Sequence, residues 1–118
     1  MLCVGPTFSA EELASLRDDM TFTPELDELA AGLALYGAPS RLKIFDLLDR
    51  TEQMCVCDLA EVLGISVSAV SQNLAKLRAY RMVKFRREAQ TLFYRLTEHP
   101  VNGIVRLAVE QAREQGEL

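Results

Sequence analysis

Two short apolar patterns separated by a glycine constrain the fold of this chain more than any other feature. The first has the i, i+3, i+4, i+7 spacing of an amphipathic helix, at Val56, Leu59, Ala60 and Leu63. The second also has helical spacing, at Val70, Leu74 and Leu77. Between them, Gly64 ends the first helix and Ser66 is a suitable N-cap for the second. Two short helices joined by so few residues predict a helix-turn-helix over residues 55–80.

The polar face of the second helix carries side chains that suit contacts with DNA. On a helical wheel, Ser68 and Gln72 lie opposite the apolar stripe and Asn73 lies nearer the core, with other polar residues on the flanks. Such side chains hydrogen-bond to base edges and phosphates in a major groove. A solvated surface would explain one polar helix equally well, but here the basic residues follow the polar ones. The predicted DNA contacts on this helix are Ser66, Ser68, Ser71, Gln72, Asn73 and Lys76.

The distribution of charge agrees with a nucleic-acid partner, although the net charge of the chain is −4. Residues 1–65 hold four basic and twelve acidic side chains, a balance of −8. Residues 66–95 hold seven basic side chains and one acidic side chain, a balance of +6. Phosphate binding needs concentrated positive charge rather than a positive total. A solvated basic face remains the alternative interpretation of this charge alone.

A pair of strands follows the helix-turn-helix. Residues 83–86 and 92–96 alternate between apolar and polar or basic side chains with a period of two, as half-buried strands do. Between them, Glu88-Ala89-Gln90 lacks the Asn-Gly or Asp-Gly pair of a tight hairpin, so we expect a loose connection. A hairpin over residues 82–97, with Arg86 and Arg87 near its tip, predicts a wing that contacts DNA.

Helices are expected on both sides of this unit. Ser9 and Glu12 form a capping box that opens a helix through about Met20, and Thr23-Pro24 opens another that Gly37 ends. Apolar residues occupy nearly every side of the segment from Ser40 to about Arg50, which indicates a buried central helix. The final helix, over residues 100–115, is more apolar than a lone surface helix, which indicates a dimer interface shared with the first helix.

These elements predict a mainly α fold: a winged helix-turn-helix with a short two-stranded wing and terminal dimerisation helices. With 118 residues, the chain is expected to hold an N-terminal arm over residues 1–8 and one domain over residues 9–118. It contains neither a long apolar run nor the features of a signal peptide. We therefore expect a cytoplasmic protein that binds double-stranded DNA and a second copy of itself, but no membrane and no small-molecule substrate.

The three cysteines, Cys3, Cys55 and Cys57, are the second informative feature. An odd number of cysteines is unusual for a disulfide scaffold, and a reducing compartment keeps them as thiols. Their residue type favours metal or redox chemistry, although a free cysteine also serves as a small buried apolar residue. Cys55 and Cys57 lie at the start of the first helix of the helix-turn-helix, whose N-terminal partial charge favours thiolate.

The spacing of Cys55 and Cys57 restricts how they bind one ion. On an intact helix the two side chains are ~200° apart about the axis, whereas residues i and i+2 of an extended segment point the same way. A shared ion therefore requires a helix that begins at or after Cys57, or a first turn that unwinds when the ion binds.

Residues 37–97 resemble the winged-helix repressors of the ArsR/SmtB family. The resemblance rests on Cys55-Val56-Cys57-Asp58-Leu59-Ala60, on residues 68–74 (Ser-Ala-Val-Ser-Gln-Asn-Leu), and on the Arg86-Arg87 pair. It implies a homodimer that binds a palindromic operator when metal-free and leaves it when a metal binds.

The cysteines of this chain match the cysteine positions of the family only in part. Cys55 and Cys57 match the family's cysteine box, but Ala60 stands where some arsenic-sensing members have a third cysteine. Cadmium- and lead-sensing members recruit cysteines from an N-terminal arm, usually the partner's, and Cys3 resembles one of these. The resemblance thus implies a metal site of Cys3, Cys55 and Cys57. A second family site near Glu98 and His99 is degraded here, because Pro100 and Gln111 stand where histidines are expected.

Thiolates select soft ions, so one Cd(II), Pb(II), Zn(II) or As(III) per site is the expected effector. The three-thiol set suits As(III) or Pb(II), whereas Cd(II) or Zn(II) needs a fourth ligand; the arm cysteine places cadmium and lead slightly ahead. The alternative is a thiol-redox-sensing or metal-independent winged-helix regulator, in which Cys3 bridges to one of the other two cysteines or none reacts. An enzyme is not expected: His99 is the single histidine and suits a turn or a cap, and no phosphate-binding glycine motif is present.

Overall fold

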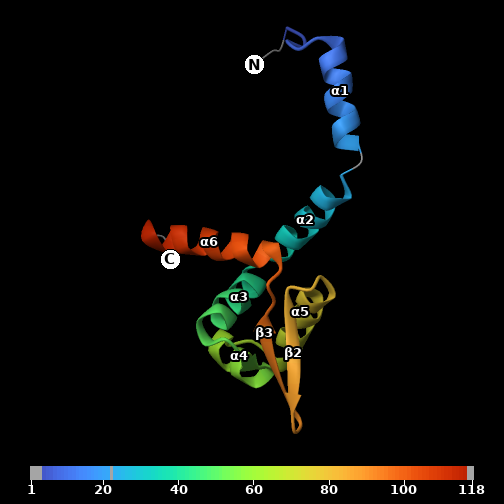
Figure 1. The fold of residues 1–118 in the computed structure, drawn as a ribbon. Helices are drawn as coiled ribbons and strands as arrows, with labels where there is room; N and C mark the ends of the chain where they lie inside the picture. Colours follow the sequence, from blue (N-terminus) through green and yellow to red (C-terminus); the bar gives the residue numbers. More distant parts are fainter. Residues whose placement is uncertain (1–3, 22, 117–118) are drawn as a thin grey trace.

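The computed structural model describes residues 4–21 and 23–116. In chain order its elements are α1 (Ala10–Thr21), α2 (Pro24–Leu35), α3 (Pro39–Thr51), β1 (Met54–Cys55), α4 (Val56–Leu63), α5 (Val67–Ala79), β2 (Val83–Glu88), β3 (Thr91–Leu96) and α6 (Pro100–Glu114). The fold is a mainly helical winged helix-turn-helix, as predicted (Figure 1). No helix in residues 4–21 or 23–116 is long and apolar enough to cross a membrane.

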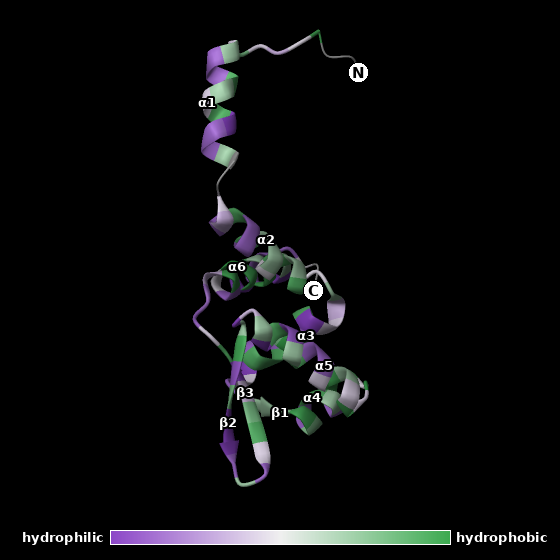
Figure 2. Cartoon of the chain, turned by 90° about the vertical axis from the view of Figure 1, so that its right-hand side faces the viewer, coloured by the Kyte–Doolittle hydropathy of each residue, from purple (hydrophilic) through white to green (hydrophobic). Residues whose placement is uncertain are grey.

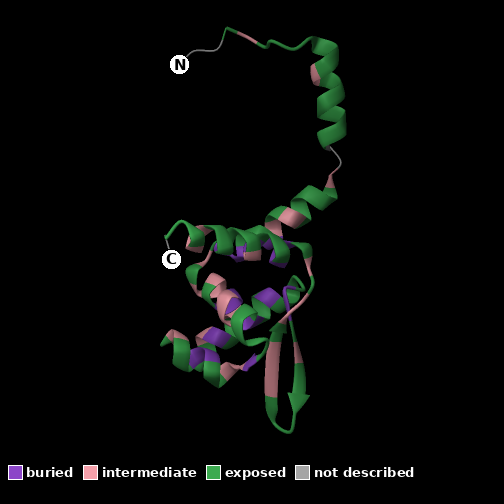
Figure 3. Ribbon diagram, turned by 60° about the vertical axis from the view of Figure 1, so that its left-hand side comes forward, coloured by how far each residue is buried: buried purple, intermediate pink, exposed green. Residues whose placement is uncertain are grey.

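The core lies where α3, α4, α5 and the start of the hairpin meet beneath α6 (Figure 3). Its fully buried side chains are Ile44, Phe45 and Leu48 of α3, Leu59 of α4, Val70, Leu74 and Leu77 of α5, then Met82, Val83 and Val101. The apolar patterns that predicted the helix-turn-helix are therefore the surfaces on which α4 and α5 pack.

The sheet has three antiparallel strands in the order β1-β3-β2, one more than the sequence predicted. Met54 and Cys55 pair with Tyr94 and Phe93, which extends the hairpin on its β3 side. The prediction of a loose hairpin was also wrong. The pairing continues to Glu88 and Thr91, which leaves a tight loop of Ala89 and Gln90 with Ala89 at a φ of +56°. Pairing along the full strands outweighs the strain of a left-handed alanine.

The N-terminal helices extend away from this body. The predicted capping box opens α1, because the Ser9 amide donates to Glu12 Oε1 (2.9 Å) and the Glu12 amide donates to Ser9 Oγ (3.1 Å). Helix α1 projects beyond α2 to the end of the molecule opposite the hairpin (Figures 1 and 2). Thr23 occupies the N-cap position of α2 as predicted, but its hydroxyl donates to the Met20 carbonyl instead of accepting a bond from α2.

Helix α2 packs closely on the body at its C-terminal end. A Cβ added to the buried Gly32 would lie 3.0 Å from both Met82 Cε and Val101 Cγ2. The glycine thus allows α2 to approach the start of the hairpin and the start of α6.

Candidate nucleic-acid interface and cysteine strand

Helix α5 presents most of its predicted DNA contacts to solvent. Ser66 is its N-cap and accepts a hydrogen bond from the Ala69 amide over 3.0 Å. Gly64, with a φ of 67°, ends α4 in the left-handed conformation and turns the chain toward α5. The apolar stripe of α5 faces the core, which leaves exposed side chains at Ser66, Ser68, Ser71, Gln72 and Lys76. Their position suits insertion of this helix into a major groove.

Asn73 does not belong to this exposed row. It is half-buried, its Nδ2 donates to the Ala69 carbonyl, and its Oδ1 accepts from Arg41 Nη1; both distances are 3.1 Å. Arg41 Nε in turn donates to the Leu35 carbonyl over 2.7 Å. Asn73 is thus engaged within the fold, at a bridge from the end of α2 to α5, rather than offered to DNA as the sequence suggested.

The register of the hairpin separates the two wing arginines. Arg87 lies on the same face of β2 as Phe85, whose ring carries the guanidinium of Arg78 from α5, 4.2 Å from the ring centroid. The side chain of Arg87 is exposed, and its guanidinium forms no hydrogen bond or ion pair within the described part of the chain. Arg86 lies on the opposite face, where it forms an ion pair with Glu88. Both arginines were predicted from the sequence to contact DNA, whereas the structure places them on opposite faces of β2 with different partners.

The cysteine box spans a change of backbone conformation. Cys55 lies in β1 with extended backbone (φ −85°, ψ 169°) and is the N-cap residue of α4. Cys57 lies in the first turn of α4, and both thiols are free, Cys55 half-buried and Cys57 exposed. Since α4 begins at Val56, the first of the two routes to a shared ion, a helix that begins at or after Cys57, does not apply. Of the two routes to a shared ion, unwinding of the first turn is the one left.

The cysteine box fits a soft ion in chemistry but not in ligand number. Thiolates at a helix N-terminus are suitable donors for such an ion. Among the described residues, however, no three His, Cys, Asp or Glu side chains are grouped to hold a metal. The predicted third ligand, Cys3, lies outside the described residues. The remaining ligands must therefore come from beyond the pair Cys55 and Cys57.

The residues of the proposed second site have structural positions. His99 is the N-cap of α6, as its sequence position suggested, and its Nδ1 accepts from the Val101 amide over 3.1 Å. That nitrogen is occupied by the backbone, and neighbouring Glu98 is exposed. Degradation of the second family site stays a prediction.

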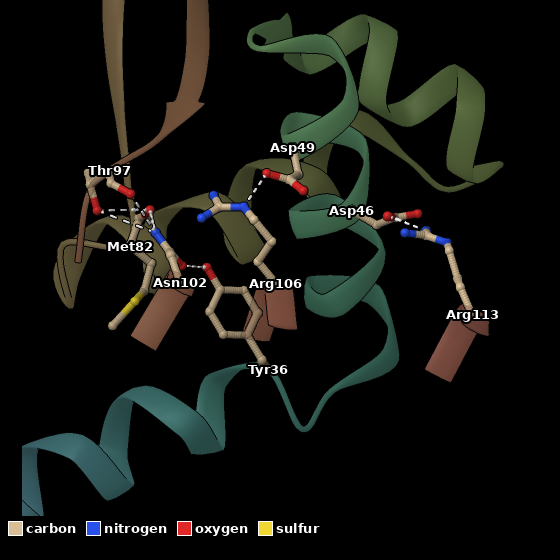
Figure 4. A network of polar contacts seen from close by, with 8 residues as sticks. All are labelled: Tyr36, Asp46, Asp49, Met82, Thr97, Asn102, Arg106 and Arg113. Carbon is tan, nitrogen blue, oxygen red and sulfur yellow. Dashed lines mark hydrogen bonds and ion pairs between the residues drawn. The ribbon is translucent and has the colours of Figure 1, made fainter. Parts of the chain in front are cut away.

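A buried polar network ties α2 and α6 to the base of the wing (Figure 4). The Tyr36 hydroxyl donates to Asn102 Oδ1 over 2.7 Å, and Asn102 Nδ2 donates to the carbonyls of Met82 (2.8 Å) and Thr97 (3.1 Å). Burial raises the pKa of Tyr36 well above its ordinary value. The sequence analysis missed this network, although an asparagine within the apolar stripe of the last helix was a detectable signal.

Two ion pairs hold α6 against α3 (Figure 4). Arg106 Nε donates to Asp49 Oδ1 over 2.7 Å, and Arg113 pairs with Asp46. Asp46 also pairs with Arg50 over 3.2 Å. Burial by itself would raise the pKa of Asp46, but hydrogen bonds and charge from Arg113 and Arg50 outweigh it and hold the pKa below the ordinary value.

Comparisons with known proteins agree with this geometry. The family described as "Bacterial regulatory protein, arsR family" matches residues 38–84. A "Transcriptional repressor SmtB homolog" from Synechocystis sp. is 32% identical over 113 residues, which cover 96% of this chain and 85% of that protein. A "Cadmium resistance transcriptional regulatory protein CadC homolog" from Staphylococcus aureus is 31% identical over 75 residues, covering 64% of this chain and 62% of the relative.

A solved structure is also similar over nearly the whole chain. The homodimeric winged helix-turn-helix DNA-binding domain of Mb0332 from Mycobacterium bovis has a TM-score of 0.69 and is 26% identical. The match covers 94% of this chain and 93% of that domain, which is described as a possible ArsR-family transcriptional regulator. The relatives found by sequence and by structure are thus regulators of transcription and not enzymes.

Proposed function

Because this chain belongs to the ArsR/SmtB family of transcriptional regulators, we propose that it is a repressor that binds operator DNA as a homodimer and releases it when a thiophilic ion binds its cysteines. The observation that carries the proposal is the position of two free thiols, one half-buried and one exposed, at the N-terminus of α4, the helix that packs on the recognition helix α5.

DNA binding is supported by exposed polar and basic side chains on α5 and on the adjacent face of the wing. The row on α5 supplies the groups that read base edges, and Gln72 is the side chain in it best suited to a bidentate contact with a base. The basic side chains around it supply charge for phosphates. Those on α5 and on its side of the wing are Lys76, Arg78 and Arg87.

A homodimer is supported by apolar surface that a single copy leaves uncovered. Large apolar side chains are exposed on α1, α2 and α6, at Leu16, Met20, Leu26, Leu33, Ile104 and Leu107. An apolar hollow of about 340 Å³ lies between Leu33 and Tyr36 of α2 and Ile104 and Ala108 of α6. A surface of this kind favours association with a second copy. The similar Mb0332 domain is itself homodimeric.

A thiophilic effector is supported by the two free thiols and by the similarity to a cadmium-resistance regulator. Cys55 and Cys57 would hold the ion, and we propose Cys3 as a further ligand from the arm. A bound soft ion would supply a fixed link between thiolates. That link requires a backbone conformation different from the one in this structure, in which Cys55 is extended and Cys57 is helical.

A change at the thiols would reach the DNA-binding helix through the packing of α4 against α5. Leu59 and Ala60 of α4 are buried against the core that α5 shares. Displacement of the first turn of α4 therefore reorients α5, because a close-packed core moves between discrete arrangements rather than deforming smoothly. Ser68, Ser71 and Gln72 leave their register with the groove as a result.

A thiol-redox regulator is the second candidate, favoured by the exposure of Cys57 and by the absence of a complete ligand cluster among the described residues. A bridge between Cys55 and Cys57 closes a small strained ring, so a redox form of the switch requires Cys3.

One titration separates the candidates. Fully reduced protein is titrated with Cd(II), Pb(II), Zn(II) and As(III) while the thiolate-to-metal absorption in the ultraviolet is followed, then again with operator DNA. We expect absorption bands and operator release in the absence of any oxidant. Release that occurs only with an oxidant establishes the redox candidate instead.

A further inference from the structure

A row of three side chains crosses the sheet from the cysteine box to the wing. Cys55 of β1 pairs with Phe93 of β3, and Phe93 pairs with Arg86 of β2. Directly paired residues of antiparallel strands project to the same face, with Cβ atoms about 5 Å apart. The thiol, the ring and the guanidinium therefore form one cross-strand row.

Arg86 is held at the end of this row by three contacts. Its guanidinium carbon lies 4.9 Å from the centroid of the Phe93 ring. Its Nε donates to Gln53 Oε1 over 3.2 Å, and its Nη1 pairs with Glu88 Oε2 over 2.7 Å. Gln53 immediately precedes β1, so two of the three contacts connect Arg86 to the cysteine strand. The third contact, with the Glu88 carboxylate, places a negative charge beside the Arg86 guanidinium.

Arg87 provides the contrast within the same strand. It projects to the other face of β2, the side on which Arg78 of α5 covers Phe85. Its exposed guanidinium thus keeps a full charge on the side of the recognition helix. Of the two wing arginines, Arg87 has the surroundings of a phosphate contact.

We infer that Arg86 is not a phosphate contact but the positioning residue through which the Cys55 strand controls the wing, in a row of Cys55, Phe93 and Arg86 anchored by Gln53. This inference rests on the proposed function, since it assigns the wing a second route from the cysteine box to DNA, separate from the packing of α4 on α5. Movement of the Cys55 backbone shifts Phe93 through the β1–β3 pairing. The shift reaches Arg86, and with it the hairpin that carries Arg87.

The test compares two adjacent substitutions in the full-length dimer. Operator affinity is measured by fluorescence anisotropy for Arg86→Ala and Arg87→Ala, at several salt concentrations, with and without Cd(II). We expect Arg87→Ala to weaken binding to all sequences and to reduce the salt slope by about one. Release by Cd(II) should persist in that variant.

Arg86→Ala should give the opposite result. Its apo affinity should stay within about twofold of wild type and its salt slope should equal the wild-type slope. Its Cd(II)-induced release should fall well below the about 5- to 150-fold range typical of such coupling. Gln53→Ala, which leaves the basic charge intact, should reduce the release in the same direction. An Arg86→Ala protein with a reduced salt slope and wild-type release overturns the inference.

A readout without metal separates this inference from the metal proposal. Iodoacetamide alkylation of Cys55 and Cys57 is followed by site-resolved mass spectrometry, with and without saturating operator. We expect operator to change the rate at Cys55 in wild type and Arg87→Ala but not in Arg86→Ala, while the rate at Cys57 reports the separate route through α4. Failure of Cd(II) to release wild-type protein overturns only the metal proposal, whereas an operator effect on Cys55 that survives in Arg86→Ala overturns the link.

Discussion

The guanidinium of Arg41 donates a hydrogen bond to Oδ1 of Asn73 over 3.1 Å, which ties α3 to the recognition helix α5. The same guanidinium donates to the Leu35 carbonyl at the end of α2. A single half-buried side chain thus connects the helix expected at the dimer interface with the helix expected in the major groove. In the proposed homodimer, we expect this bridge to help set the orientation of α5.

Arg41→Met should therefore weaken operator binding without removing a phosphate contact. The aliphatic stem is retained, but two charge-assisted hydrogen bonds are lost, each worth about 1.5–3 kcal/mol. Operator affinity and thermal stability should both fall, while the salt slope of binding stays at the wild-type value. Lys43→Met, an exposed change on the same helix, is the matched control. A reduced salt slope in Arg41→Met would instead make Arg41 a phosphate contact.

Gln72 and Asn73 are adjacent on α5 and should respond differently to alanine. Gln72 is exposed, so its loss should erode the preference for operator over unrelated DNA by about 1–3 kcal/mol with little change in stability. Asn73→Ala removes the partner of Arg41, so it should lower stability and affinity for all sequences equally. Competition assays with operator and scrambled duplexes measure the preference. A preference that survives in Gln72→Ala and is lost in Asn73→Ala contradicts the assignment.

The difference between Asn73 and Gln72 shows how far the sequence could predict the site. Helical spacing, Gly64 and Ser66 are local signals, and they located α4, α5 and the exposed row correctly. The partner of Asn73 is Arg41, 32 residues away in the chain, and no local signal connects the two. Helical periodicity placed Asn73 near the core but did not reveal its hydrogen bonds.

The strands show the same division between local and distant information. Period-two alternation predicted β2 and β3, but β1 is only Met54 and Cys55, and it is a strand because Tyr94 and Phe93 lie beside it. The tight loop at Ala89 likewise results from pairing along the whole hairpin. The separation of Arg86 from Arg87 depends on this register.

Tyr36→Phe should lower the free energy of unfolding by about 1–3 kcal/mol, because Asn102 Oδ1 loses its buried donor. The raised pKa of Tyr36 adds a pH dependence. The unfolded chain ionises this tyrosine near its ordinary pKa of 10.0, whereas the folded chain keeps it protonated, so folding stability falls as the pH rises above 10.

The slope is at most about 1.4 kcal/mol per pH unit, and Tyr36→Phe should lack it. Urea unfolding of both proteins between pH 8 and about pH 11.5 isolates the effect as a difference, which removes the contribution of the other titrating groups. Parallel curves for the two proteins would show that Tyr36 ionises alike in the folded and unfolded chains.

Asp46 should give an acid-side dependence of opposite sign. Its pKa is held below the ordinary value of 3.8 by Arg113 and Arg50, so its contribution to stability is complete above that value. The contribution is lost as the pH falls below it, because the folded chain resists a proton that the unfolded chain accepts. Asp46→Asn should flatten acid unfolding below about pH 4 relative to wild type, as measured by urea unfolding of both proteins at several pH values.

The last prediction concerns the proposed switch at Cys57. If a soft ion favours a conformation that binds operator poorly, the operator must weaken ion binding by the same factor. Serine retains the packing of the first turn of α4 but not the soft ligand. Cys57→Ser should therefore bind operator like wild type and fail to release it on titration with Cd(II), where wild type should show a coupling of about 1–3 kcal/mol.

Cys3→Ser is the companion variant, because it tests the arm without altering α4. If Cys3 completes the coordination, its loss should lower ion affinity and leave part of the release, a milder effect than that of Cys57→Ser. Anisotropy titrations of all three proteins on labelled operator, under reducing conditions, distinguish these cases. A Cys57→Ser protein that still releases operator at the wild-type Cd(II) concentration would place the sensing site away from α4, and the exposed Glu98 beside His99 would be the next position to test.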